Sequence, residues 1–233
     1  MFKQIKLTIP LLLLSASVVA EDGVSGAIET GVVFTSGNTE TRTINVKGKT
    51  EYVNGKSRNN LSVEALYVDG KTGKLSEKYL GQGKTAYQYT DTSYAFINGT
   101  LERDLFSGYD YQATISTGYG YRFIDDKKIT LDAEAGPGYR QNKLDNEEAE
   151  GEVIGRASGL FAYRIAKTST FTEELVSEFG SDAVISKSVT ALTAQIVGNM
   201  AMKASLTIEH NSNTPEGVDA IDSETALTLV YSF

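Results

Sequence analysis

Apolar and polar residues alternate with a period of two along most of this 233-residue chain. The clearest example is its end, where Leu227, Leu229, Tyr231 and Phe233 fall on one face of a strand and the intervening residues fall on the other. Successive side chains of a β-strand point to opposite faces, so a period of two indicates strands. No run of about 18 or more apolar residues occurs, which excludes a bundle of membrane helices.

Turn-forming residues interrupt this alternation and divide it into twelve predicted strands. The 213 residues after position 20 leave about 18 residues for each strand with its connection. That length accommodates the tilted strands of ~10 residues that cross a bilayer. The predicted strands span 23–35, 40–53, 58–69, 79–91, 94–105, 110–123, 129–140, 151–165, 169–179, 187–197, 200–210 and 223–233.

Composition excludes several classes of function. The chain has 22 basic and 30 acidic residues, a formal net charge of −8, which argues against a nucleic-acid partner. It has no Cys, so a disulfide scaffold, a thiol nucleophile, a cysteine metal site and a lipid anchor on Cys are excluded. A single His leaves little for metal binding or acid–base catalysis. We therefore expect no metal and no other cofactor.

The first twenty residues have the pattern of a secretory signal peptide. Lys3 and Lys6 precede a short apolar core at Leu11–Leu14, and small residues lead to a predicted cleavage point after Ala20. An N-terminal membrane anchor is the alternative, but the apolar stretch is too short to span a bilayer. The predicted mature domain is residues 21–233.

The predicted strands fit a closed antiparallel up-and-down transmembrane β-barrel. In such a barrel the apolar face points outward to lipid and the polar face lines the lumen. The apolar faces mix Gly, Ala and Thr with Leu and Ile, which is light for a packed core. A soluble periplasmic barrel or sandwich is the alternative. Aromatic residues gather toward predicted strand ends, as in the girdles of membrane barrels: Tyr52, Tyr87, Tyr89, Tyr94, Tyr121, Phe123, Tyr163, Phe171, Tyr231 and Phe233.

Connection lengths support the same architecture. Short connections alternate with mostly longer ones, which is typical of barrels with short periplasmic turns and longer outer loops. An even number of strands returns both termini to the periplasm. The short connections are 54–57, 92–93, 124–128, 166–168 and 198–199, and the longer ones are 70–78, 141–150, 180–186 and 211–222.

Charged residues occur in the middle of the polar faces, where we expect them to point into the lumen. Twelve strands lie between the eight that enclose only side chains and the 16–18 that enclose a water channel. The charges could therefore form a selective channel or close the lumen by pairing across it. The predicted lumen-facing residues are Lys47, Lys49, Glu64, Lys84, Glu102, Asp104, Asp132, Glu134, Arg156 and Glu209.

His210 and Ser212 are the candidates for catalysis. They share one strand face, and outer-membrane phospholipase A, another twelve-stranded barrel, carries a similar His-x-Ser pair. Such chemistry needs the His within hydrogen-bond reach of the Ser hydroxyl. The tripeptide is common, and the rest of the chain does not resemble that enzyme. We therefore expect no catalytic residue, with a lipid-active hydrolase as the alternative.

Four further features give local expectations. Pro137, between Gly136 and Gly138, predicts a bulge or bend near the outer rim, because proline cannot donate to the strand ladder. Glu173 and Glu174 fall on both faces, so one of them points toward lipid headgroups or the register shifts. Asn98-Gly99 is expected within a strand rather than at a turn. The acidic segments 145–152 and 216–222 lack metal-loop spacing and are expected to be solvated.

Several segments, in order, resemble a known family. Residues 229–233 look like the C-terminal signal that the barrel-assembly machinery reads, with Leu229, Tyr231 and Phe233 on its apolar face. The others are Ser36–Thr41, Phe106–Asp110, Gly118–Phe123, Ala135–Arg140 and His210–Ser212. Together they resemble the salt-induced outer-membrane protein (YdiY-like) family, domain of unknown function 481.

The resemblance implies a barrel in the outer membrane of a Gram-negative bacterium and supplies no reaction, ligand or catalytic residue. We expect a monomer that contacts outer-membrane lipid and lipopolysaccharide, does not bind nucleic acid, and acts as a narrow passive pore or as a structural, stress-related envelope protein.

Overall fold

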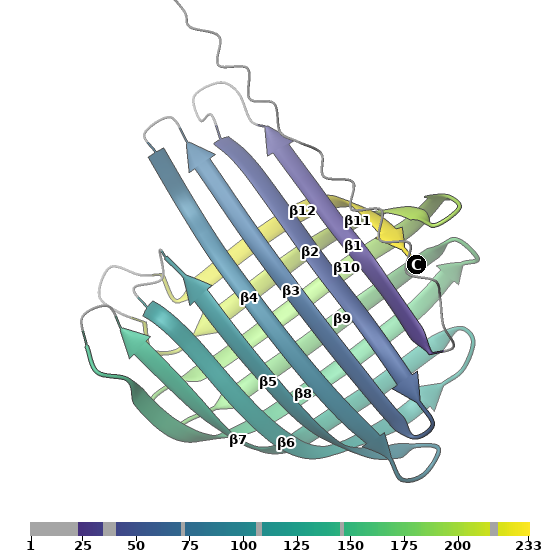
Figure 1. The fold of residues 1–233 in the computed structure, drawn as a ribbon, viewed down its shortest axis with the longest axis horizontal. Coiled ribbons are helices and arrows are strands. Elements are labelled where there is room, and N and C mark those ends of the chain that lie inside the picture. Colours follow the sequence, from purple (N-terminus) through teal and green to yellow (C-terminus); the bar gives the residue numbers. More distant parts are fainter. Residues whose placement is uncertain (1–22, 35–40, 71–72, 106–108, 145–146, 215–218) are drawn as a thin grey trace, which may run out of the picture.

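The computed structural model describes residues 23–34, 41–70, 73–105, 109–144, 147–214 and 219–233. The predicted signal peptide, 1–20, lies outside these residues. The described chain forms one closed barrel of twelve antiparallel strands, as the sequence predicts (Figure 1). The strands are β1 (Val24–Phe34), β2 (Thr41–Asn54), β3 (Ser57–Gly70), β4 (Gly73–Gln88), β5 (Ser93–Asp104), β6 (Tyr109–Asp125), β7 (Ile129–Leu144), β8 (Glu150–Ala166), β9 (Ser169–Phe179), β10 (Val184–Val197), β11 (Met200–Asn211) and β12 (Ile221–Ser232).

Each strand pairs with its neighbours in sequence, and β12 closes the barrel against β1. In Figure 1 the strands β1 to β5 form a near wall that crosses in front of β9 to β12. The closing seam is short: Ala27–Thr30 of β1 pair with Leu229–Ser232 of β12. No helix in the described segments is long and apolar enough to span a membrane.

The last residue makes the closing contact. Phe233 and Gly26 exchange two backbone hydrogen bonds of 2.9 Å. The Phe233 ring lies so close to Gly26 that a Cβ at this position would overlap it. Glycine at position 26 therefore makes room for the ring that ends the chain.

We expect deletion of Phe233 to reduce the fraction of chain that refolds into detergent micelles. The deletion removes two backbone hydrogen bonds, each contributing about 0.5–1.5 kcal/mol, and the ring contact at Gly26. Circular dichroism of the refolded protein measures the effect. Ser232→Ala is the control, because it keeps the backbone hydrogen bond from Ser232 to Asn199. Equal refolding of the deletion and this control would show that closure does not depend on Phe233.

Short connections join the strands at the end of the barrel that holds both described termini. Gly55 and Gly198 have φ values of 57° and 53°, a left-handed conformation that glycine adopts readily. In the connection from β6 to β7, Asp126 Oδ1 accepts the backbone N–H groups of Lys128 and Ile129, both at 2.7 Å. These hydrogen bonds lower the pKa of the Asp126 carboxyl.

The strands at the opposite end are longer than predicted. β4 begins at Gly73 rather than 79, because Lys74 and Ser76 continue the ladder opposite Asp69 and Val68. The predicted long connection 70–78 is therefore wrong: only residues 71–72 join β3 to β4. The connections after β7, β9 and β11 are likewise shorter than predicted, and span 145–149, 180–183 and 212–220. Pairing continues there past the point at which the alternation of apolar residues fades.

Pro137 does not cause the predicted bulge near the rim. It lies in the middle of β7 and pairs with Gly155 on β8 without a register shift. Toward β6, pairing is interrupted between Ser116–Gly138 and Tyr119–Ala135 and resumes in the same register. Proline has no N–H to donate at this point, so the ladder breaks without an inserted residue.

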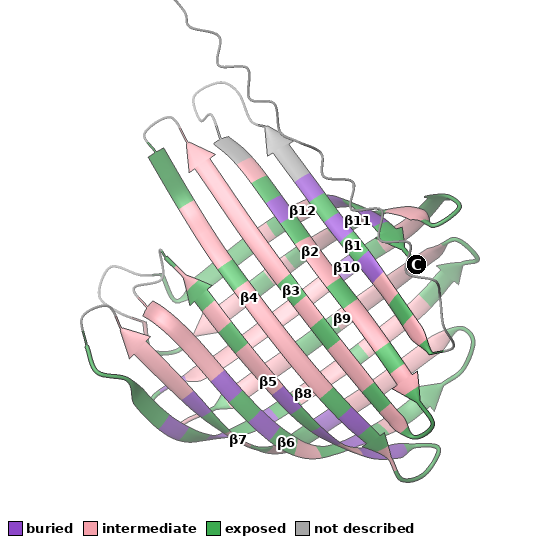
Figure 2. Ribbon diagram, viewed as in Figure 1, coloured by how far each residue is buried: buried purple, intermediate pink, exposed green. Residues whose placement is uncertain are grey.

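The barrel wall has an apolar outside and a polar inside. Exposed and less exposed residues alternate along the strands (Figure 2). The exposed set contains large apolar side chains such as Val63, Ile97, Ile115 and Val153, the last 75% exposed. The buried set is dominated by polar and charged groups: Glu29, Asn45, Ser93, Asn98, Thr114, Ser116, Glu134, Arg140, Glu152, Arg156 and Thr228. This is the reverse of a soluble protein and matches a membrane barrel.

Two sequence expectations about side-chain position are settled by this pattern. Asn98-Gly99 lies within β5, as predicted. Tyr94 does not belong to an aromatic girdle: it is 8% exposed and donates a hydrogen bond to Glu134 inside the barrel. Tyr94 shares the strand parity of Asn98 and Glu102, and parity decides its direction more strongly than its aromatic ring.

Candidate functional site

A chain of four alternating charges crosses the interior of the barrel near the end opposite the termini. Glu209 Oε2 on β11 lies 3.3 Å from Lys187 Nζ on β10 and 3.5 Å from Lys78 Nζ on β4. Lys78 Nζ also lies 2.8 Å from Glu102 Oε1 on β5. Four strands separate β11 from β4 on one side of the barrel and six on the other. The Lys78–Glu209 pair therefore joins opposite walls. We call these four residues the transverse ion-pair chain.

A second group gathers around Glu134, toward the end that holds the termini. Its carboxylate accepts hydrogen bonds from Tyr94 Oη at 2.8 Å, Arg156 Nη1 at 3.3 Å and Ser158 Oγ at 3.1 Å, and it pairs with Lys84 Nζ. Since these residues come from β4, β5, β7 and β8, the group fills one side of the interior.

The Phe96 ring packs against the two cations of the Glu134 group. Its ring is 2% exposed and lies 5.2 Å from Lys84 Nζ and 5.6 Å from the Arg156 guanidinium. Both distances allow cation–π attraction. The two cations are thus held between a carboxylate and an aromatic face.

A third group is centred on Arg140, which is 1% exposed. Its guanidinium donates to Glu152 at 2.5 Å, to Glu178 at 3.4 Å and to the carbonyl oxygen of Ala183 at 2.7 Å. Glu152 also accepts the backbone N–H of Asp182 at 2.9 Å. The group ties the connection between β9 and β10 to the inner wall.

The remaining predicted lumen residues also lie on the inner register, most in ion pairs. Glu29 lies 3.2 Å from Lys49 and 2.8 Å from Lys203, Lys47 lies 3.1 Å from Glu64, and Asp132 lies 3.5 Å from Arg122. Asp104 follows Glu102 by two residues on β5. The sequence analysis did not single out several residues that complete these groups: Glu29, Lys78, Arg122, Arg140, Glu178, Lys187 and Lys203. Strand parity was available for all of them except Lys78, which fell in the predicted connection 70–78. Glu152, expected in a solvated acidic segment, is instead buried and accepts hydrogen bonds from Arg140.

The structure does not assemble the predicted His210–Ser212 pair. His210 lies opposite Ser186 and Ile221 on the outward register of β11. The Ser212 hydroxyl accepts the backbone N–H of Val184 at 2.8 Å, and no hydrogen bond between His210 and Ser212 exists among the described residues. A histidine base must contact the serine hydroxyl, so this geometry does not favour nucleophilic catalysis. In the described segments no group of three or more His, Cys, Asp or Glu could hold a metal ion.

Glu173 is a carboxylate on the outside of the barrel. It is opposite Phe161 and Thr190, without a register shift, and Glu174 takes the inward position. Ser188 Oγ and Thr190 Oγ1 donate hydrogen bonds to Glu173 at 2.6 and 2.5 Å. The predicted register shift is therefore wrong at this point, Glu173 faces outward, and the hydroxyl donors on β10 reduce the cost of an outward charge.

Comparison with known proteins places the chain in a family. The model of "Protein of unknown function, DUF481" matches residues 28–233. The chain belongs to this family. The predicted resemblance is therefore confirmed. An Escherichia coli (strain K12) member, "Uncharacterized protein YdiY", is 27% identical over 208 residues, which cover 89% of this chain and 82% of that protein.

Two solved structures share the fold of the present chain. The translocator domain of the autotransporter NalP from Neisseria meningitidis has a TM-score of 0.55 at 10% identity, covering 91% of this chain and 89% of that one. An outer membrane channel from Pseudomonas putida F1 has a TM-score of 0.56 at 10% identity, covering 91% and 95%. At this identity the likeness concerns the fold alone, which is that of outer-membrane β-barrels.

Proposed function

We propose that this chain is a monomeric integral protein of the Gram-negative outer membrane that acts as a narrow passive pore for small ions. The single observation that carries the proposal is the Lys78–Glu209 pair, which crosses the interior and divides it. Closure of the lumen by such pairs in a structural barrel is the alternative, and the conductance measurement below decides between the two. An interior that is mostly polar but crossed by side chains leaves only narrow, hydrated paths.

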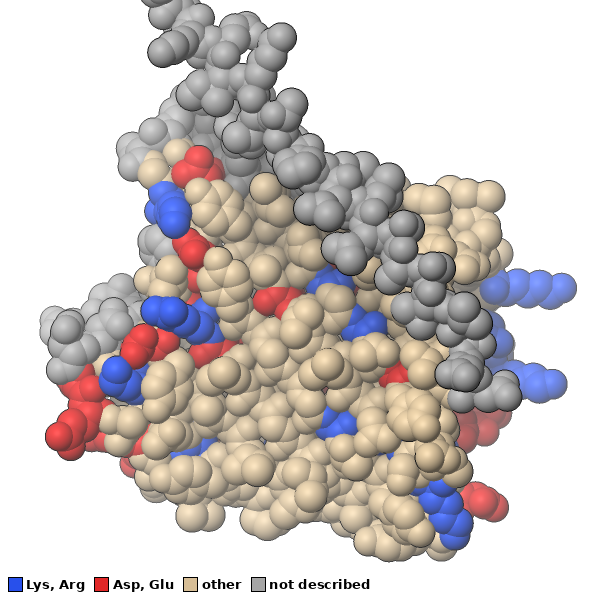
Figure 3. All heavy atoms as spheres, in the orientation of Figure 1, with Lys and Arg blue, Asp and Glu red and all other residues tan. Residues whose placement is uncertain are grey.

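The outer surface supports insertion into lipid. Uncharged residues form most of the near wall in Figure 3, and charged side chains gather at both ends of it, including the end where β4 begins and β5 ends. Aromatic pairs lie at the other end, such as Tyr121–Phe123 with ring centroids 5.0 Å apart. A band of apolar residues between polar or aromatic rims is the surface that a bilayer requires.

The direction of insertion follows from the connections. All connections at the end that holds both described termini have two to four residues, whereas the opposite end holds the longest connection, 212–220; we assign the end with the termini to the periplasm. Export through cleavage after Ala20 and assembly through the signal at Leu229, Tyr231 and Phe233 complete the proposed route. The transverse ion-pair chain then lies toward the cell exterior, and the Glu134 group lies toward the periplasm.

We expect the charge-neutral double variant Lys78→Ser/Glu209→Ser to conduct several times more current per channel than the unaltered protein in planar bilayers. The substitutions remove the two side chains that join opposite walls and leave the sum of charges unchanged. Lys47→Ser/Glu64→Ser is the matched control. It removes a pair between adjacent strands β2 and β3, which lies along the wall.

Two results would contradict the proposal. Silence of both the unaltered protein and the Lys78/Glu209 variant would identify a sealed, structural barrel. Equal conductance of the two double variants would show that the transverse ion-pair chain does not restrict the path.

A further inference from the structure

Four glycines with no steric need for glycine lie together on the outer face of the barrel. They are Gly48 on β2, Gly81 and Gly83 on β4, and Gly99 on β5, and Gly83 is directly opposite Gly99. A Cβ at Gly83 would meet nothing within 4 Å, and at the other three it would make ordinary contacts of 3.6 to 4.0 Å. Glycine weakens a strand interior and often marks a place where a ligand approaches closely.

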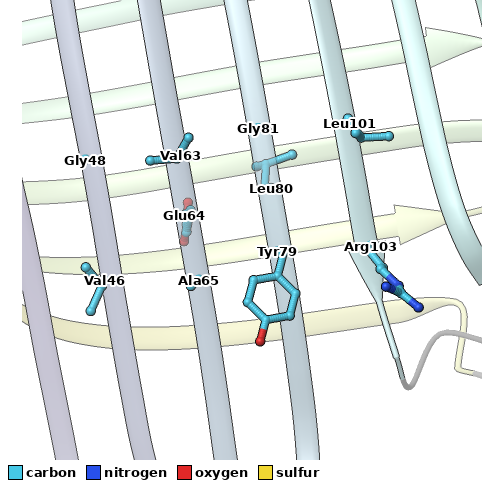
Figure 4. Close-up of a pocket in the computed structure, with 10 residues that line it drawn as sticks. All are labelled: Val46, Gly48, Val63, Glu64, Ala65, Tyr79, Leu80, Gly81, Leu101 and Arg103. Atoms are coloured by element: carbon cyan, nitrogen blue, oxygen red, sulfur yellow. The ribbon is translucent and has the colours of Figure 1, made fainter.

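Two of these glycines, Gly48 and Gly81, line a groove in the outer surface, and Gly83 lines a neighbouring hollow. The groove has a volume of about 400 Å³ and is lined by Val46, Val63, Leu101, Tyr79 and Arg103 around Gly81. In Figure 4, Tyr79 and Arg103 lie side by side at one end, while the positions of Gly48 and Gly81 carry no side chain. The result is a trough with an apolar floor and a polar end.

The polar end carries a cation that is available to a ligand. Arg103 on β5 is directly opposite Tyr79 on β4. Its side chain is 59% exposed, and its Nη2 atom lies 3.6 Å from Asp110 Oδ1. Nearby, Lys74 lies 2.7 Å from Glu77, which also accepts a hydrogen bond from Tyr79 Oη at 2.9 Å. Because the Arg103 side chain is largely exposed, part of its guanidinium faces solvent beside Asp110, and its donors suit phosphate oxygens.

We propose that this groove binds lipid A, the membrane anchor of lipopolysaccharide, with an acyl chain over Gly81 and a phosphate on Arg103. Arg103 is next to last in β5, at the end assigned to the cell exterior, where the lipid leaflet carries phosphate groups of this kind. The inference rests on the proposed location and orientation. The charge at one end and the open glycines below it match a molecule with an anionic head and saturated chains.

Native mass spectrometry of the full mature protein, released from detergent after titration with lipid A, tests this assignment. We expect one bound lipid A to be retained at concentrations where phosphatidylglycerol is not. Arg103→Ala removes the guanidinium that would donate hydrogen bonds to the phosphate. Gly81→Leu fills the groove without a clash, because the nearest atom to a Cβ at position 81 is Leu101 O at 4.0 Å. Each should weaken retention roughly tenfold, which corresponds to the loss of one charge-assisted contact or of the apolar site.

Gly155→Leu is the matched control. Gly155 faces outward on β8, and a Cβ there meets nothing within 4 Å, but it lies away from the groove. Equal retention by Gly81→Leu and Gly155→Leu would overturn the groove as the site. Preferential retention of phosphatidylglycerol would overturn lipid A as the ligand. None of these variants alters the inner face, so conductance reports the proposed pore separately.

Discussion

Replacing Arg140 with Met is expected to lower the free energy of unfolding of the barrel by about 3–5 kcal/mol, the usual cost of removing one partner from a buried ion pair. The Arg140 guanidinium is the shared donor to Glu152 and Glu178 and to the Ala183 carbonyl oxygen. Without it, two carboxylates remain on the inner wall with no cation between them. The connection after β9 loses one of its ties at the same time.

Denaturant titration of the protein in lipid vesicles, followed by circular dichroism because the chain has no Trp, measures this change. Arg58→Met is the control: its guanidinium lies 3.7 Å from Glu51, Arg58 is exposed and Glu51 is half-buried, and the loss of this pair should cost less than about 1 kcal/mol. Adding Glu152→Gln to Arg140→Met should restore part of the stability, because it removes one of the unpaired charges. Equal midpoints for Arg140→Met and Arg58→Met would show that the buried group does not stabilise the barrel.

The architecture could be predicted because strand parity is a local property of the sequence. Twelve runs of alternating residues became twelve strands, and parity placed charged residues such as Lys84 and Glu134 on the same face. The ends of the strands could not be predicted in this way. Beyond the apolar band, pairing depends on backbone hydrogen bonds such as those that extend β4 back to Gly73, and these leave little trace in hydropathy.

The partners of the inner charges could not be predicted from one strand at a time. Lys78 and Glu209 are 131 residues apart in the sequence. They meet because the diameter of the barrel and the stagger of its strands bring them to the same height on opposite walls. Arg140 was visible on a polar face, but its burial depends on the connection between β9 and β10 folding against it. Such contacts are properties of the closed barrel.

A methyl group added at Gly136 should destabilise the barrel by about 1–3 kcal/mol, the usual cost of overpacking. The Cβ of an alanine there would lie within 3.0 Å of the backbone of Thr117 and Gly118. Gly118 is constrained in the same way by the backbone of Ala135 and Gly136. The two glycines therefore allow β6 and β7 to approach closely at the break in their ladder.

Gly83→Ala is the matched control for Gly136→Ala, since it adds the same methyl group in mid-strand where a Cβ meets nothing within 4 Å. There the loss of glycine's backbone freedom should leave stability unchanged or slightly raised. The comparison separates the intrinsic strand preference of glycine from the steric requirement at Gly136. A loss of stability at both positions would assign the effect to strand interiors in general, whereas a loss confined to Gly136 locates it in the contact between β6 and β7, where Pro137 interrupts the ladder. The same denaturant titration in vesicles resolves the two outcomes.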